Sequence, residues 1–123
     1  MAVVDRVETE SMEPVHWLLV GLATVTGLIH LGLGLAAPTT PVGAASVLAG
    51  IGYGVGIGLV LMDRMRLVVY AVAIPYVGAQ IVLWYLIQQP DSLAAVGPAA
   101  MVDKPVQAVL IGLCLYLLVR EWS

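Results

Sequence analysis

The sequence has few charges and few reactive side chains. Its 123 residues include one cysteine, Cys114, and only 11% of them are charged. A single cysteine excludes an intramolecular disulfide, and Cys114 lies in an apolar run where a small packing residue is expected. Five basic and eight acidic residues give a net charge of −3 without a basic patch, which argues against nucleic acid as a partner.

Apolar residues are abundant and fall into four long runs. They make up 61% of the chain, and its mean hydropathy is +1.01. A soluble domain of this size has too much surface for its volume to hide so many apolar side chains. Nearly all charges lie outside the runs, and each run is long enough for a helix to cross a bilayer. The sequence therefore predicts an all-α polytopic membrane protein, embedded in the lipid bilayer and without a separate soluble domain.

Prolines and charges mark the predicted boundaries. Residues 1–13 are predicted to be a polar tail, and residues 14–122 a four-helix transmembrane domain. Pro14 and Pro105 suit the first turn of a helix, where the missing N–H is no loss. Asp103 is then the predicted N-cap of the last helix. The predicted helices span residues 14–37, 42–62, 65–88 and 105–122, with a longer loop over residues 89–104.

The basic residues predict the orientation. Arg6, Arg64, Arg66 and Arg120 belong to one side of the predicted topology, and Lys104 belongs to the other. Because short cytoplasmic segments carry an excess of arginine and lysine, both termini are expected in the cytoplasm. The chain is thus predicted to be a multi-pass protein of the cell membrane.

Five glycines alternate with larger residues in the second apolar run. They are Gly50, Gly52, Gly54, Gly56 and Gly58. At about 100° per residue, Gly50, Gly54 and Gly58 share one helix face, and the other two lie on roughly the opposite face. Both spacings are small-xxx-small patterns that let helix backbones approach closely. The second helix is therefore predicted to pack between two close neighbours.

Four polar side chains are predicted to meet inside the membrane. His30 and Gln80 both lie roughly 10–12 Å below the same end of their predicted helices, with Thr26 and Tyr76 one turn deeper. A bare imidazole or amide in hydrocarbon wastes hydrogen bonds, so these groups should pair with each other or with water. We interpret the cluster first as a neutral histidine that locks the first helix to the third. Proton or ligand handling is the functional alternative.

His16 and His30 raise a haem alternative. They lie 14 residues apart, within about 40° of one helix face and about 21 Å along the axis. This spacing resembles the paired histidines on one helix of the cytochrome b family. A second helix with matching histidines is missing from the sequence, so a twofold dimer would have to supply the other ligands. We therefore expect no cofactor.

The sequence contains no other set of residues with a recognised chemistry. No Cys/His set fits zinc, and no glycine-rich loop with lysine fits a phosphate site. With Asp103 placed in a loop, no carboxylate is expected inside the predicted spans, which removes both a Ser/His/Asp triad and the usual carboxylate of ion-coupled transport. The chain is accordingly predicted not to be an enzyme.

Two strings of the sequence resemble a known family. They are Thr26-Gly-Leu-Ile-His-Leu-Gly-Leu-Gly34 and Ile74-Pro-Tyr-Val-Gly-Ala-Gln-Ile-Val-Leu-Trp-Tyr85. They are similar to strings in small, uncharacterised four-helix membrane proteins of haloarchaea. The composition, with no phenylalanine, one lysine and an acidic excess, also resembles that of proteins from salt-loving archaea. The resemblance implies four helices and an archaeal source, and it assigns no active residue.

The small size and the abundant glycine favour one function over two alternatives. We expect a non-enzymatic membrane protein that works as a homo-oligomer or as an accessory subunit of a larger membrane complex. The first alternative is a small channel or carrier that uses His30 and Gln80. The second is a haem-bearing electron carrier with His16 and His30 as ligands.

Overall fold

Four long helices form the structure, a computed structural model that describes residues 10–89, 91–92 and 96–122. α1 spans Pro14–Ala36, α2 Pro41–Leu61, α3 Arg66–Gln88 and α4 Pro98–Trp122. All four are long and apolar enough to cross a membrane. The described residues contain no strand. The predicted all-α fold with four membrane-spanning helices is confirmed.

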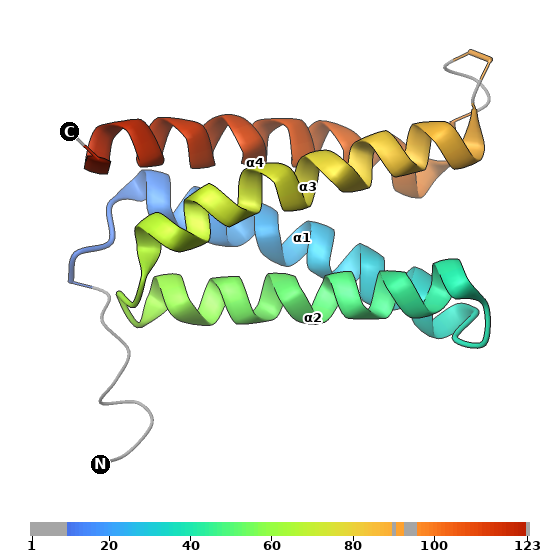
Figure 1. Ribbon diagram of the computed structural model, residues 1–123, viewed down its shortest axis with the longest axis horizontal. Coiled ribbons are helices and arrows are strands. Elements are labelled where there is room, and N and C mark those ends of the chain that lie inside the picture. Colours follow the sequence, from blue (N-terminus) through green and yellow to red (C-terminus); the bar gives the residue numbers. More distant parts are fainter. Residues whose placement is uncertain (1–9, 90, 93–95, 123) are drawn as a thin grey trace.

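The helices run up and down, so α1 begins at the same end of the bundle at which α4 finishes (Figure 1). We call this the termini end, and the opposite end, where α1 meets α2 and α3 meets α4, the cavity end. α1 packs against both α2 and α4. α3 starts beside α2 and finishes beside α4, so α2 and α3 diverge toward the cavity end (Figure 1).

One face each of α1 and α4 supplies most of the buried residues, and Tyr53, Val60, Tyr70 and Val77 of α2 and α3 complete the core. The buried residues of α1 and α4 recur every three or four positions, which is the spacing of a single helix face. Most of them are small or apolar, but polar side chains take the same positions toward the cavity end. The buried residues are His16, Leu19, Ala23, Thr26, Gly27, His30 and Gly34 in α1, and Asp103, Gln107, Leu110, Cys114 and Leu117 in α4.

Glycines let α1 and α2 approach until their backbones touch. A Cβ atom on Gly34 would lie 2.6 Å from the carbonyl oxygen of Gly43 and 2.7 Å from the backbone nitrogen of Val47. A Cβ atom on Gly50 would lie 2.5 Å from Leu31 Cγ. Close glycine packing of this kind replaces the hydrophobic driving force that lipid removes.

The predicted glycine faces of α2 are only partly used. Gly50 contacts α1 and Gly52 accommodates the Tyr76 hydroxyl of α3, whereas a Cβ on Gly56 would only reach ordinary contact with α3. Gly54 and Gly58 have no described neighbour within 4 Å of an added Cβ. Because positions four apart drift by about 40° on a helix, Gly58 has turned about 80° away from the face of Gly50.

The fourth helix begins earlier than the sequence predicted. Its first residue is Pro98, so the predicted start at residue 105 is wrong, and Pro105 lies inside the helix. Both prolines suit a first turn, and the prediction chose Pro105 because Asp103 just before it could serve as the N-cap. Membrane-spanning helices tolerate an internal proline where neighbouring groups can bond to the freed carbonyl. As a result, Asp103 is not an N-cap in a loop but a buried helical residue.

Charged side chains tie the termini end together. The guanidinium of Arg66 donates to the carbonyl oxygen of Val60 through Nε at 2.9 Å and Nη2 at 2.7 Å, and through Nη1 to Ser11 Oγ at 2.9 Å. Arg120 of α4 pairs with Glu13 before α1, at 2.6 Å between Nη2 and Oε1. These contacts hold the ends of α2 and α4 to the residues that precede α1.

Candidate functional site

A carboxylate, a hydroxyl and an imidazole meet in the interior near the cavity end. Thr26 Oγ1 donates a hydrogen bond to Asp103 Oδ1, joining α1 to α4. His30 Nδ1 lies 4.0 Å from the same carboxylate oxygen and 3.4 Å from Thr26 Oγ1. Thr26 is fully buried and Asp103 is 3% exposed. The carboxylate is therefore inside the bundle, where a buried charge needs partners.

Lys104 neutralises this carboxylate. Its ammonium lies 2.9 Å from Asp103 Oδ2 and donates to Gln107 Oε1 at 3.0 Å. The same ammonium lies 5.5 Å from the centre of the Trp84 ring, within range of a cation–π contact. The sequence had placed Lys104 in an outer loop, whereas the structure places it in α4. The pair Asp103–Lys104 thus sums to no net charge.

A layer of hydrogen-bonded side chains lies next to the charged pair. Tyr53 of α2 donates through its hydroxyl to Gln80 Oε1 of α3 at 2.7 Å. Gln107 Nε2 of α4 donates to Gln80 Oε1 at 2.8 Å and to the Tyr53 hydroxyl at 3.2 Å. The Tyr53 ring also lies 5.8 Å from the His30 ring. We call Tyr53, Gln80 and Gln107 the amide layer, after its two glutamine side chains. This layer connects α2, α3 and α4.

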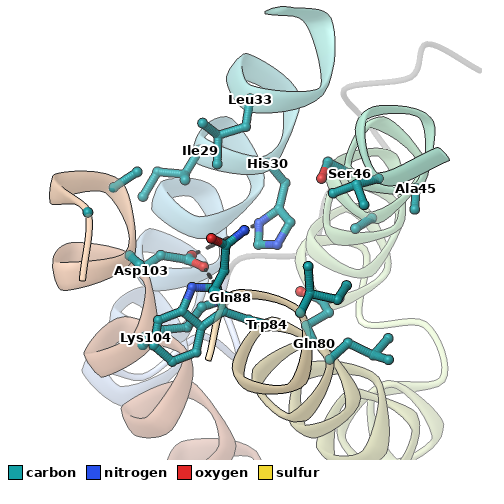
Figure 2. Close-up of a pocket in the computed structure, with 17 residues that line it drawn as sticks. Ile29, His30, Leu33, Ala45, Ser46, Gln80, Trp84, Gln88, Asp103 and Lys104 are labelled. Carbon is teal, nitrogen blue, oxygen red and sulfur yellow. Dashed lines mark hydrogen bonds and ion pairs between the residues drawn. The ribbon is translucent and has the colours of Figure 1, made fainter. Parts of the chain in front are cut away.

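A cavity of about 360 Å³ opens beside these groups at the cavity end. Figure 2 shows its side chains converging from all four helices, with the His30 ring between Asp103 on one side and Ser46 on the other. His30, Gln80, Asp103 and Lys104 supply most of its polar groups, and Trp84 and Ile29 are among its apolar walls. The divergence of α2 and α3 makes room for this cavity.

The backbone determines which nitrogen of His30 carries the proton. His30 Nδ1 lies 2.8 Å from the carbonyl oxygen of Thr26. A carbonyl only accepts, so Nδ1 must donate, and in the neutral ring Nε2 then carries a lone pair. Within the described part of the chain, Nε2 has no hydrogen-bond or ion-pair partner. His30 therefore offers one unused basic nitrogen at a residue that lines the cavity.

Thr26, His30 and Asp103 do not form a catalytic triad. A triad needs a nucleophile whose hydroxyl is bonded to the histidine nitrogen that faces away from the acid. Here the Thr26 hydroxyl donates to Asp103 instead, and Thr26 is fully buried. The expectation that no carboxylate lies within the spans is wrong, but the carboxylate found there holds a hydroxyl and an ammonium rather than activating a nucleophile.

The predicted polar residues are only partly brought together. Thr26 and His30 are in contact, and Gln80 lines the same cavity, but His30 and Gln80 form no hydrogen bond with each other. Tyr76 lies apart, because its hydroxyl donates to the carbonyl oxygen of Ala49 at 2.7 Å. The two polar residues of α3 thus bond to different partners: Gln80 to the amide layer and Tyr76 to the α2 backbone.

Sequence reasoning missed Tyr53, Gln107 and the buried role of Asp103. A signal for two of them was present: counting back from Leu110, the buried spacing of α4 continues through Gln107 to Asp103. An apolar face that is extended in steps of three and four predicts where polar residues turn inward. Tyr53 gave no such signal, since it stands alone among glycines.

His16 takes a structural position. It is 2% exposed, its Nδ1 accepts from the Glu13 backbone N–H at 3.0 Å, and its Nε2 lies 3.5 Å from Glu121 Oε1 without hydrogen-bond geometry. Both ring nitrogens therefore face groups of the chain itself. Among the described residues, no cluster of three His, Cys, Asp or Glu side chains fits a metal ion.

The fold and site define a four-helix integral membrane protein with a charge-balanced polar cluster inside its helices. Residues 3–118 match a family of unknown function, DUF7475, and because the match covers nearly the whole chain, this protein belongs to that family. The expected membership of an uncharacterised family is confirmed, and the haloarchaeal source stays a prediction. Among curated proteins and solved structures nothing matches the chain.

Proposed function

We propose that this protein is a small membrane carrier that binds a polar group in the cavity through His30 Nε2 and the Lys104 ammonium. The observation that carries the proposal is the unpartnered Nε2 atom of His30 beside a cavity of about 360 Å³. Ionisable residues inside membrane-spanning segments are expensive to bury, and by default they indicate a functional site.

The polar groups around the cavity are only partly satisfied: within the described residues, Ser46, Gln88 and Gln80 Nε2 of the lining have no hydrogen-bond partner, and His30 and Lys104 keep unused positions beside Asp103. Both Asp103 oxygens and both functional ends of Gln107 have partners. Among the described residues His30 Nε2 has no partner, and Lys104 has used two of its three N–H donors on side chains. A bound group that donates to the imidazole and accepts from the ammonium would use these two positions. The site is thus complementary to a ligand that has a donor and an acceptor.

A carrier fits this geometry better than an open channel does. Toward the termini end, the cavity gives way to the amide layer and then to the apolar side chains of Leu110, Cys114 and Leu117. No polar residue of α4 faces the interior between Gln107 and Leu117. A polar solute would therefore have to wait for the helices to rearrange before leaving at the other end. In this proposal the site binds its ligand without transforming it; the Thr26 hydroxyl is buried and already bonded to Asp103.

Co-purification tests this proposal. We expect native mass spectrometry of the protein, extracted from its own membrane in mild detergent, to show a bound small molecule. The adduct should be lost from His30→Ala and retained by His16→Gln, since His16 lies at the termini end. The identified molecule should then cross liposome membranes faster with wild type than with His30→Ala. An adduct that His30→Ala retains, or a wild type without any adduct, would overturn the cavity as a binding site.

A second candidate function is self-association or assembly with other membrane subunits. It is favoured by Gly54 and Gly58, which have the small-xxx-small spacing and no neighbour in the described chain. A second copy of α2, or a partner helix, would pack against them. Gly54→Leu and Gly58→Leu should convert an oligomer in mild detergent into monomers by light scattering. Gly21→Leu, which also has open space, is the matched control. A monomeric wild type would refute this role.

A further inference from the structure

We infer that the ligand of the proposed cavity site is an amphiphile, with an uncharged, hydroxyl-bearing head beside His30 and an apolar tail along α2 and α3. The inference rests on the proposed function and names its ligand class. It comes from a second hollow of about 390 Å³, which is almost purely apolar and is lined mainly by α2 and α3, with two residues each from α1 and α4.

The two hollows lie end to end along one seam. On α2, the polar cavity is lined as far as Ala49, and the apolar hollow begins at Gly52. On α3, the cavity is lined from Gln80 onward, and the hollow from Val77 back toward Val68. On α2 the hollow runs from Gly52 to Val60, or about 12 Å of helix. A molecule that lies along the seam thus meets polar groups at one end and apolar groups at the other.

Tyr76 lies at the junction of the two hollows. Its hydroxyl reaches across the seam to the carbonyl oxygen of Ala49, and a Cβ atom on Gly52 would lie only 2.2 Å from that hydroxyl. Its ring packs edge-on against Tyr53, with the ring centres 5.4 Å apart. Tyr76 lines the apolar hollow and not the polar cavity, so in the proposed orientation the chain passes beside its ring. The tyrosine thereby separates the head region from the tail region.

Charge balance selects the head group. The cation in the cavity lining, Lys104, is already neutralised by Asp103 at 2.9 Å. An anionic head would therefore bring an uncompensated charge into the membrane interior, which is strongly unfavourable. A hydroxyl head adds no charge; one O–H donates to His30 Nε2, and its oxygen accepts from Lys104. The apolar tail contributes by leaving water and by packing against residues such as Val69 and Val72.

Gly56 allows the tail region to be blocked without touching the head region. It lines the apolar hollow, and the nearest atom to an added Cβ is Val69 Cγ1 at 3.8 Å. In Gly56→Leu, the larger side chain would fill part of the hollow. Gly78→Leu in α3 adds the same side chain at a position with nothing within 4 Å of its Cβ and outside both hollows. It is the matched control.

Trp84 reports on the head region. It lines the polar cavity, and the double variant Trp17→Tyr/Trp122→Tyr leaves it as the only tryptophan, so its fluorescence reports on this site. This variant is titrated with three probes: monooleoylglycerol, glycerol as the head group alone, and anionic lyso-phosphatidylglycerol. We expect saturable binding of monooleoylglycerol, weakened at least about tenfold by Gly56→Leu and unchanged by Gly78→Leu. Glycerol and the anionic amphiphile should each bind at least about tenfold more weakly than monooleoylglycerol.

The outcomes separate this inference from the function on which it rests. If glycerol binds as tightly as monooleoylglycerol, or if folded Gly56→Leu binds monooleoylglycerol as tightly as wild type, the apolar hollow does not bind the tail. The proposed site in the polar cavity is not affected by either result. Tighter binding of the anionic amphiphile overturns the uncharged head. If no probe changes Trp84 emission, the amphiphile is refuted, and co-purification then decides the cavity site separately. If Gly56→Leu does not fold, monoacylglycerols brominated at two positions of the acyl chain test the orientation instead. Bromine beside the ester should quench Trp84 emission more strongly than bromine at the end of the chain, and equal quenching would refute the orientation.

Discussion

Replacing Asp103 by asparagine tests whether this residue caps a helix from a loop or lies in a buried ion pair. Asparagine has the same shape and keeps an oxygen that accepts from Thr26, but it removes the charge that neutralises Lys104. An asparagine caps a helix about as well as an aspartate. At an exposed N-cap, the substitution would therefore cost no more than about 1 kcal/mol, from the lost interaction with the helix dipole.

The structure predicts a larger loss. Asp103 is 3% exposed, and the Lys104 side chain is 16% exposed, so the pair lies mostly out of solvent. Removing one partner of a buried pair costs roughly 3–5 kcal/mol, because the other charge stays buried without compensation. Lys104 keeps Gln107 Oε1 and the face of Trp84 as neighbours. We therefore expect a loss near the lower end, about 3 kcal/mol, in the free energy of unfolding.

A double variant isolates the charge effect. Asp103→Asn/Lys104→Met removes both charges and leaves the Lys104 site apolar, so its stability should return to within about 1 kcal/mol of wild type. The assay is reversible unfolding in mixed detergent micelles by titration with a denaturing detergent, followed by helicity. A loss below about 1 kcal/mol for Asp103→Asn, or a double variant less stable than the single one, would refute the buried ion pair.

Three further predictions follow from local geometry. Nitrogen-15 NMR should show that the two histidines are opposite neutral tautomers. The proton should lie on Nε2 in His16, because its Nδ1 accepts from a backbone N–H, and on Nδ1 in His30, which donates to a carbonyl. Two rings of the same tautomer would contradict these hydrogen bonds. Gly34→Ala should lower the stability by about 1–3 kcal/mol, because its Cβ meets the α2 backbone at 2.6 Å. Gly32→Ala, with open space, should gain up to about 1 kcal/mol in the same unfolding assay, and equal effects would refute the close approach. Met65 has a left-handed φ of 56°, so Met65→Gly should stabilise the protein by about 1 kcal/mol, whereas a loss would show that its backbone is not in that region.

Part of the site could be predicted from the sequence because it depends on one helix alone. Thr26 and His30 lie four residues apart, so any helix through them brings their side chains together. The similar depths of His30 and Gln80 also followed from counting residues, and both line the cavity. Which atoms they bond to depended on other helices. Gln80 bonds to Tyr53 and Gln107, neither of which lies on a helix that counting along α1 or α3 can reach.

The sequence by itself determined that four stretches of this chain form helices long and apolar enough to cross a bilayer. Hydropathy and length decide that much, because backbone groups in lipid must be satisfied within each helix. Only the tertiary structure decided that Asp103 and Lys104 face the interior rather than a loop. Pro98 and Pro105 both suit a first helical turn, so the choice between them depends on the partners that Thr26, Gln80 and Tyr53 offer to α4.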